Sequence, residues 1–338
     1  MRKKMIFAAL LLILVLLVSA CTPASPPPTQ PAASDEGTRW TIAMIPKYKG
    51  IPYFNACEQG ALEAAAELGI DFIWDGPTEP RVDRQIEMIS AWIAQGVDAI
   101  LVSPNDPIAI APIMQTARDA GILVMTWDAD SDPSARSFFV NQASADAIGN
   151  KLVDLMVEEA GPDAPVAIIT EGLTDANQNA WIAAIEERIE ELGVGMEIVR
   201  ILPSDGDQSR AFTATQDILR TYTEVRGIWG LSSAAGPGVA QAVRDMGLSG
   251  EVIVGAVATP STLVEFLLDG TMISNVLWNP IDLGYLSIYA AVAYLESGGQ
   301  IGDTIYAGRL GYKEVRGDEI LLGEPYVFTR YNVEQFDF

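Results

Sequence analysis

The sequence predicts an α/β protein built from two doubly wound, parallel-sheet lobes. Short β-branched runs alternate with helical segments from about residue 40 towards the C-terminus, which is the rhythm of βαβ units. The expected strands are apolar at nearly every position, as strands are when both faces of a parallel sheet are covered. Roughly 300 residues follow the N-terminal segment, which is enough for two domains.

The first half of the chain contains four expected strands with three helices between them. The strands are Thr41–Pro46, Asp71–Asp75, Ala99–Ser103 and Leu123–Asp128. The helices are Tyr53–Leu68, Arg81–Gln95 and Ile108–Ala120. In the second helix Ile86, Ile89 and Ile93 fall three and four residues apart, which gives one buried stripe. A glycine follows each helix, where a left-handed C-terminal cap is favoured: Gly69, Gly96 and Gly121.

The second half of the chain repeats this scheme. Its expected strands are Pro165–Thr170, Glu197–Leu202, Gly227–Leu231, Val252–Val257 and Ile273–Trp278. The helices between them include Gln178–Leu192, Ala211–Tyr222, Pro237–Met246 and Pro260–Asp269. The two halves therefore predict two lobes with a cleft between them.

The N-terminal segment predicts export from the cytoplasm. A basic start and an apolar run over Met5–Ala20 precede Cys21, and the run is shorter than the roughly 20 residues of a membrane-spanning helix. Val18-Ser19-Ala20-Cys21 resembles the lipobox of bacterial lipoproteins. We therefore expect a signal peptide over 1–21 with lipidation of Cys21, and a Pro/Ser-rich tether over 22–38. The alternative is an uncleaved anchor helix; either way the folded part lies outside the cytoplasm, held at a membrane.

Charge and composition exclude several function classes. The formal net charge is −24, and removal of Arg2, Lys3 and Lys4 with the signal peptide makes it −27. This disfavours nucleic acid as a partner and a basic helix lying on a membrane. The chain has no histidine, which removes Ser-His-Asp and Cys-His catalysis and most zinc sites. Cys57 is the only cysteine after Cys21, so we expect a small apolar helix residue there and no disulfide in the folded part. We expect no metal and no cofactor.

Candidate binding residues follow from the topology. In doubly wound sheets, ligands bind beyond the carboxyl ends of the strands. In the first lobe this rule selects Lys47, Asn105, Asp106, Asp128 and Asp130. In the second lobe it selects Asn177, Gln178, Asn179, Ser232, Ser233, Trp278 and Asn279.

Several strings, in the same order along the chain, resemble the bacterial periplasmic sugar-binding proteins of the ribose-binding-like class. The strings are Ala43–Lys47, Asp75–Pro80, Thr126–Asp130, Val140–Ala143, Asn177–Trp181 and Leu277–Pro280. The likeness extends from Arg39 to the end of the chain and is strongest to the rhamnose-binding and autoinducer-2-binding subgroups, both ABC-transporter substrate-binding lipoproteins. It implies a periplasmic-binding-protein fold whose lobes are joined by a three-crossover hinge. The expected lobes are 39–142 with about 280–304, and 143–279 with about 305–338.

The resemblance also implies contacts with a solute trapped in the cleft. They would come from Lys47, Asp128, the pair Asn177-Gln178 and Trp278, with Tyr53 and Phe54 at an aromatic position that lines the cleft. The full set of expected ligand-binding residues is Lys47, Phe54, Asp128, Asp130, Asn177, Gln178, Ser233, Trp278 and Asn279.

Each of these side chains also has a structural interpretation. Asp128 could cap the following loop, Lys47 could be a surface charge, and Trp278 could be a core residue. Asn177 and Gln178 could form the N-cap of the helix that follows them.

At three positions this chain differs from the autoinducer-2 subgroup, and these differences bear on the identity of the solute. The autoinducer-2 subgroup has aspartate at the position of Asn177, proline at Leu231 and alanine at Ser233. Asn177–Trp181 and Leu277–Pro280 look more like the rhamnose subgroup. We therefore expect a monosaccharide, rhamnose or another deoxy sugar, captured by hinge closure and delivered to an ABC permease in the membrane by a monomer.

Two other functions stay open. One is a receptor for autoinducer-2 or a sugar signal, which would use the same closed surface. The other is an extracytoplasmic glycosidase that uses Asp128 and Asp130, which lie two residues apart and within the range of a carboxylate pair. The polar turn after Asp130 offers nothing apolar to keep one acid protonated, which disfavours the enzyme.

Overall fold

The computed structural model describes residues 39–338, which form one compact unit. The signal peptide, Cys21 and the tether lie outside the described residues. Within 39–338 no helix has both the length and the apolar character needed to cross a membrane.

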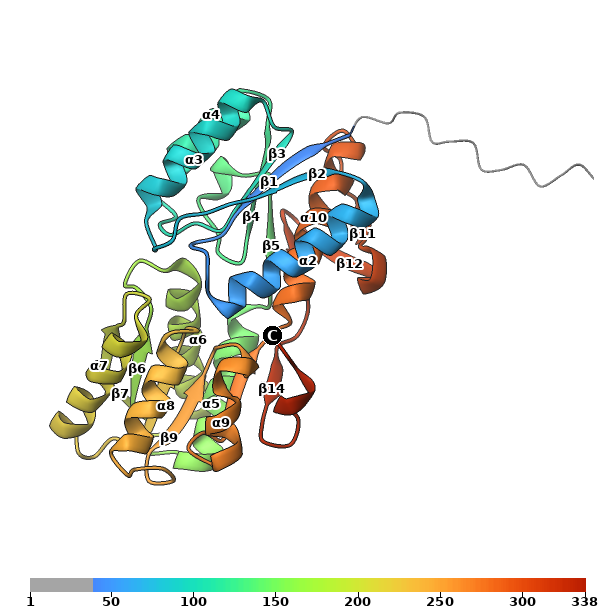
Figure 1. The fold of residues 1–338 in the computed structure, drawn as a ribbon. Coiled ribbons are helices and arrows are strands. Elements are labelled where there is room, and N and C mark those ends of the chain that lie inside the picture. The colour runs from blue at the N-terminus through green and yellow to red at the C-terminus, as the bar shows by residue number, and fades with distance from the viewer. Residues whose placement is uncertain (1–38) are drawn as a thin grey trace, which may run out of the picture. The chain divides into compact units, whose positions relative to one another are not determined.

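The first lobe is an eight-stranded sheet with four helices (Figure 1). Its strand order is β11-β12-β13-β5-β4-β3-β1-β2. The strands are β1 (Thr41–Ile45), β2 (Asp71–Trp74), β3 (Ala99–Val102), β4 (Leu123–Trp127), β5 (Phe138–Asn141), β11 (Thr304–Tyr306), β12 (Tyr312–Arg316) and β13 (Glu319–Leu321). The helices are α2 (Pro52–Leu68), α3 (Val82–Gln95), α4 (Ala111–Asp119) and α10 (Pro280–Glu296), with short 3₁₀ turns at Pro133–Ala135 and Gly308–Leu310.

The second lobe is a six-stranded sheet with the order β14-β10-β9-β8-β6-β7. Its strands are β6 (Pro165–Thr170), β7 (Glu197–Pro203), β8 (Gly227–Gly230), β9 (Ile253–Ala256), β10 (Ser274–Leu277) and β14 (Tyr326–Phe328). Its helices are α5 (Ala145–Ala160), α6 (Ala176–Leu192), α7 (Gln208–Thr221), α8 (Ala235–Asp245) and α9 (Pro260–Asp269), and a 3₁₀ turn covers Val333–Gln335. In this sheet the strands from β6 to β10 pair with their neighbours in parallel, and β14 pairs antiparallel with β10. The two doubly wound lobes expected from the sequence are therefore confirmed.

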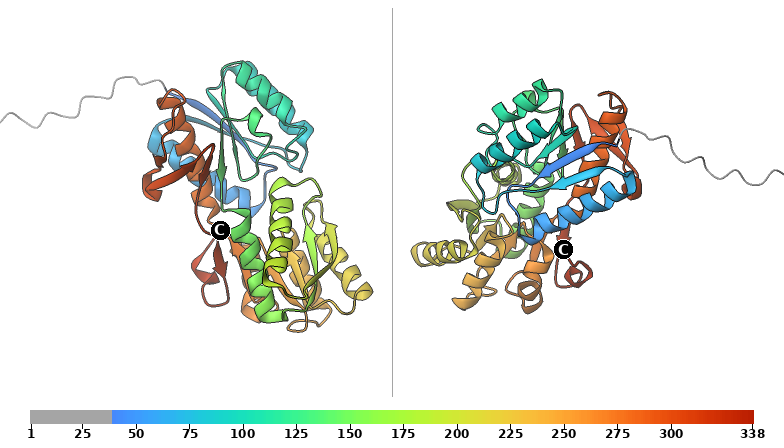
Figure 2. Two further views of the ribbon diagram at one scale, coloured as in Figure 1. Left: turned by 180° about the vertical axis from the view of Figure 1, so that it is seen from behind. Right: turned by 45° about the horizontal axis from the view of Figure 1, so that its top comes forward.

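Alternating strand residues face two different helix layers in the first lobe. Ile42 and Met44 of β1 pack with α2 and α10 in one cluster, while Ala43 and Ile45 pack with α3 and α4 in another. Figures 1 and 2 show these helix pairs on opposite faces of the sheet. Helices cover both faces of the sheet here, which is why β1, β3 and β4 are apolar at nearly every position.

Helices α2 and α10 approach each other closely. A Cβ atom on Gly60 would overlap the carbonyl oxygen of Ile281, and one on Gly284 would overlap that of Cys57. Only glycine allows the two backbones to meet at these points. Cys57 is fully buried in this contact as a free thiol, which agrees with the expected apolar role.

The chain passes between the lobes three times, after β5, after β10 and after β13. The first two passages lie at the expected positions, but the third lies between β13 and β14 rather than near residue 305. Residues 304–321 belong to the first sheet because β11, β12 and β13 form an antiparallel meander and β13 pairs parallel with β5. The expected boundary at 304/305 is therefore corrected to 321–326.

Candidate ligand-binding site

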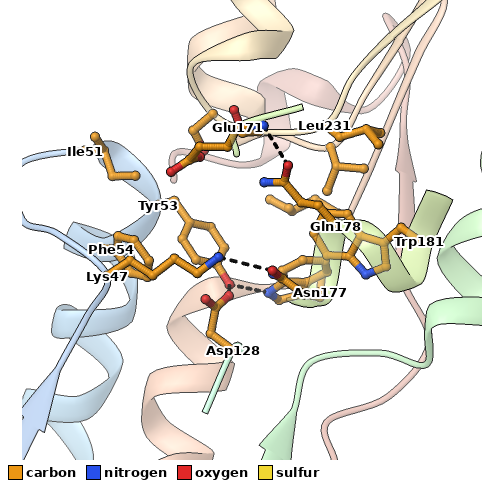
Figure 3. A pocket seen from close by; sticks show the side chains of 15 residues that line it. Lys47, Ile51, Tyr53, Phe54, Asp128, Glu171, Asn177, Gln178, Trp181 and Leu231 are labelled. Carbon is orange, nitrogen blue, oxygen red and sulfur yellow. Dashed lines mark hydrogen bonds between the residues drawn. The ribbon is translucent and has the colours of Figure 1, made fainter. Parts of the chain in front are cut away.

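A small cavity lies between the two lobes, beyond the carboxyl ends of strands from both sheets (Figure 3). Its volume is about 50 Å³. A cavity of roughly 10–15 Å³ is enough to hold one water molecule, so this one has room for several. This size favours a small solute over an oligosaccharide or a peptide. The lining residues are Lys47, Ile51, Tyr53, Phe54, Asp128, Glu171, Asn177, Gln178, Trp181, Leu231, Ser232, Ser233, Val257, Leu277 and Trp278.

Asp128 follows β4 directly and is only 3% exposed. Its backbone has a φ of 64°, a left-handed conformation that aspartate tolerates better than most residues. The carboxylate accepts hydrogen bonds from the hydroxyls of Tyr53 at 2.6 Å and Ser103 at 2.8 Å. Burial raises the pKa of Asp128, while Lys47 and these two hydroxyls oppose the rise. Asp128 is thus held in place by two donors and still faces the cavity.

Lys47 follows β1 and connects the two lobes. Its ammonium group forms an ion pair with Asp175 and donates a 3.1 Å hydrogen bond to Oδ1 of Asn177. Burial alone would lower the pKa of Lys47, but the carboxylates around it, Asp175 above all, raise it. Lys47 is therefore a buried cation, 5% exposed, and not the surface charge that was the alternative interpretation.

Asn177 and Gln178 lie in the first turn of α6, and neither is its N-cap. The N-cap position is Asp175, whose side chain makes no capping bond because it pairs with Lys47. Oε1 of Gln178 accepts from the Thr170 hydroxyl and, at 2.7 Å, from the backbone N–H of Glu171. These bonds fix the amide so that its nitrogen is a donor for a cavity occupant (Figure 3).

Aromatic side chains form the apolar part of the wall. The Trp278 ring lies 5.9 Å from that of Tyr53 and 5.8 Å from that of Trp181, centroid to centroid. Nε1 of Trp278 donates to the Tyr53 hydroxyl at 3.0 Å. Phe54 packs edge-on against Tyr53 at 5.1 Å. Trp278 is thus both a buried core residue and part of the cavity wall.

Two of the expected residues, Asp130 and Asn279, do not line the cavity. Asp130 accepts a bidentate pair of hydrogen bonds from Arg136, at 2.8 and 2.7 Å, so it holds the β4–β5 connection instead. Oδ1 of Asn279 accepts from the backbone N–H groups of Ile281 and Asp282 and caps α10. Both predictions are corrected: strand-end position alone does not separate ligand-facing side chains from structural ones.

Three residues of the site were missed by sequence reasoning. Glu171 comes directly after β6 and lines the cavity, so the strand-end rule could have selected it. Asp175 binds Lys47 from the second lobe, a contact between distant positions that no sequence spacing indicates. Trp181 lines the cavity wall from α6. In the sequence it stands out only as the last residue of the family-like segment Asn177–Trp181, with no ligand contact predicted for it.

These features define the class of protein. Residues 42–300 match the model of the periplasmic binding protein domain family, and the chain belongs to that family. Among its relatives is the ribose import binding protein RbsB of Escherichia coli (strain K12), 24% identical over 258 residues that cover 74% of this chain and 83% of that protein.

Two solved structures of solute-binding proteins are similar to this chain over most of its length. An ABC transporter solute binding protein from Clostridium phytofermentas with bound L-rhamnose is 26% identical, with a TM-score of 0.84, and covers 88% of this chain and 98% of that chain. LsrB from Clostridium saccharobutylicum in complex with AI-2 is 27% identical, with a TM-score of 0.82, and covers 88% of this chain and 100% of that chain. The chain is a ribose-binding-like substrate-binding protein of the sugar ABC transporter family.

Proposed function

We propose that this protein captures a single monosaccharide, rhamnose or another deoxy sugar, and delivers it to an ABC permease. The observation that carries the proposal is the cavity between the lobes, where Lys47, Asp128 and Gln178 meet beside an aromatic wall. Folded outside the cytoplasm and held at the membrane through Cys21, a monomer would bind its solute by hinge closure and present the closed form to the permease.

The polar groups of the cavity suit a neutral polyol. Asp128 accepts hydroxyl protons, Gln178 donates through its amide, and the serines do either. Among the described residues that line the cavity, Lys47 is the one cation, and it already pairs with Asp175. An anionic solute such as a sugar phosphate would therefore meet more negative than positive charge, which disfavours it.

The apolar wall supports a deoxy sugar. Phe54, Trp278 and Trp181 offer ring faces and edges, and Leu231 with Val257 adds aliphatic surface. Such a wall covers the C–H face of a sugar ring, or a methyl group in place of a hydroxyl, without leaving a polar group unpaired. The similar structure with bound L-rhamnose points the same way.

Autoinducer-2 is the second candidate. Lys47, Asp128 and Gln178 agree with the autoinducer-2 subgroup, and the similar LsrB structure holds AI-2. The departures at Asn177, Leu231 and Ser233 all fall in the cavity lining. They change polarity and volume where the solute would lie, so we rank the sugar first.

The structure does not support the remote alternative, a glycosidase that uses Asp128 and Asp130 as its carboxylate pair. Asp130 is bound by Arg136 and does not line the cavity with Asp128. The similar proteins reported above are sugar-binding transport proteins. Turnover of an aryl rhamnoside by the purified protein would contradict this assignment.

A thermal-shift screen followed by calorimetry tests the proposal. Residues 22–338 are mixed with L-rhamnose, D-ribose, D-allose, D-xylose, D-arabinose or AI-2. A solute that binds only the native state raises the melting temperature by mass action, and we expect L-rhamnose to give the largest shift. A larger shift with AI-2 would favour the signal receptor, and no shift with any of the six would refute sugar capture.

A further inference from the structure

In and directly beside the cavity, buried carboxylates outnumber buried cations. Asp128, Glu171 and Asp175 are 3%, 8% and 8% exposed, and Lys47 is 5% exposed. Lys47 forms its ion pair with Asp175. Within residues 39–338, Glu171 has no ion-pair partner, although its carboxyl group faces the cavity (Figure 3). Buried charges are normally paired or neutralised, so this carboxylate needs an explanation.

The surroundings of Glu171 come from both lobes. Lys47 and Tyr48 approach from the end of β1, Asp128 from the end of β4, and Asp175 from the start of α6. A Cβ atom on Gly206, in the loop before α7, would lie 3.8 Å from Oε1 of Glu171 and 3.5 Å from the Tyr48 hydroxyl. The neighbouring Asp205 is turned to Arg210, 2.5 Å away, at the surface. Lys47 is therefore the only cation that faces Glu171 in the described part of the chain.

The protein backbone also fixes Glu171 in this position. Its N–H donates to Oε1 of Gln178 at 2.7 Å, and its carbonyl accepts from the N–H of Asp205 at 2.6 Å. These bonds fix the backbone from which the side chain extends, and the residue is only 8% exposed. Burial raises the pKa of Glu171 to about 7; Lys47 and the Tyr48 hydroxyl oppose the rise, and Asp175 and Asp128 add to it. A neutral solute that displaces cavity water would strengthen this effect of burial.

We propose that Glu171 binds the solute as a neutral carboxylic acid, so that sugar binding takes up a proton from solvent. The carboxylate gains one proton from water or buffer, and the new O–H group donates a hydrogen bond to an oxygen atom of the sugar. No other bond forms or breaks. This inference rests on the proposed capture of a neutral sugar and adds a residue that selects for neutral solutes.

The expected pH dependence follows from proton linkage. If only the protonated form binds, the affinity is greatest below the pKa of free Glu171, about 7, and decreases above it by up to about tenfold per pH unit. Between pH 6 and pH 8 the affinity should fall by about tenfold. The chain has no histidine, the residue type that ordinarily titrates in this range.

Calorimetry tests the inference on residues 22–338. The ligand is L-rhamnose, or another sugar if that sugar binds more tightly in the screen. Titrations at pH 6, 7 and 8 in two buffers of different ionisation enthalpy count the protons taken up. We expect the tenfold loss of affinity and close to one proton taken up at pH 8. Glu171→Gln should bind the sugar with no proton uptake, and its affinity should be almost independent of pH. Glu197→Gln, at the exposed amino end of β7, should keep the wild-type profile.

Several results would overturn the inference. A wild-type protein that binds the sugar with no proton uptake, or a Glu171→Gln variant that keeps the wild-type pH profile, would do so. Tighter binding of D-glucosamine than of the neutral sugar would show that Glu171 acts as an anion. These results leave sugar capture intact, whereas no sugar binding at any pH refutes the proposed function and this inference with it. The proton count of the wild type decides the matter even if Glu171→Gln does not fold.

Discussion

Asp128→Asn is the substitution that most directly tests the site. A carboxylate offers about four lone-pair positions, and in the structure Tyr53 and Ser103 occupy two of them. About two remain for hydroxyl groups of the solute. Each hydrogen bond to a charged acceptor contributes roughly 1.5–3 kcal/mol. Asparagine replaces one oxygen atom with an amide donor and so removes one of these two bonds, which would cost about 1.5–3 kcal/mol, or about one to two orders of magnitude in affinity.

The same substitution should leave the fold intact. Asparagine tolerates the left-handed backbone at this position, where φ is 64°. Burial raises the pKa of Asp128, so removing this charge does not remove a stabilising group. Calorimetry with L-rhamnose measures the affinity, and thermal unfolding without sugar measures the stability. Asp130→Asn is the matched control outside the cavity. The reasoning is wrong if Asp128→Asn binds within about threefold of wild type while folding normally.

Three other predictions concern stability. Asp130→Ala should lower the free energy of unfolding by about 1–3 kcal/mol in denaturant titrations, because the buried Arg136 loses its bidentate partner, while the affinity for sugar stays within about twofold. Gly60→Val should prevent normal packing of α2 on α10 and abolish soluble expression or lower the melting temperature strongly, whereas Gly302→Ala, with open space around its Cβ position, should change neither. Because the pKa of Glu171 is raised from its unfolded value of 4.5 to about 7, its contribution to stability is present below pH 4.5 and lost as pH rises through 7. Glu171→Gln should therefore be more stable than wild type at pH 8, by about 3 kcal/mol, but not at pH 5; equal stability at both values would contradict the assigned burial.

The sequence predicted most of the fold because the fold depends on local patterns. Buried parallel strands such as Ala99–Val102 are continuously apolar, and glycines such as Gly96, with a φ of 74°, end the helices where expected. The meander over 304–321 was assigned to the wrong lobe for a physical reason. Its strands are short and alternate polar with apolar residues, and their place depends on the pairing of β13 with β5, which no local pattern encodes.

The site was predictable only as far as topology positions side chains. Lys47, Asp128 and Gln178 line the cavity because parallel strands deliver their following residues to one edge of a sheet. The same rule selected Asp130, because sequence position does not reveal the Arg136 that binds it. It missed Asp175 because the partner of this residue, Lys47, lies in the other lobe. Which way a strand-end side chain turns depends on partners that are distant in sequence.

The glycine contact between α2 and α10 has a consequence for how new specificities could evolve. Tyr53 and Phe54 lie in the first turn of α2, and Trp278 lies just before α10. Two helices in direct backbone contact therefore hold these three rings of the aromatic wall as one rigid unit, while Trp181 comes from α6. Mutations there risk unfolding the protein. Asn177, Leu231 and Ser233, where the chain departs from the autoinducer-2 subgroup, all belong to the other lobe, on or next to a helix start or strand end. A lineage could therefore exchange one solute for another by altering these second-lobe positions while inheriting the first lobe unchanged.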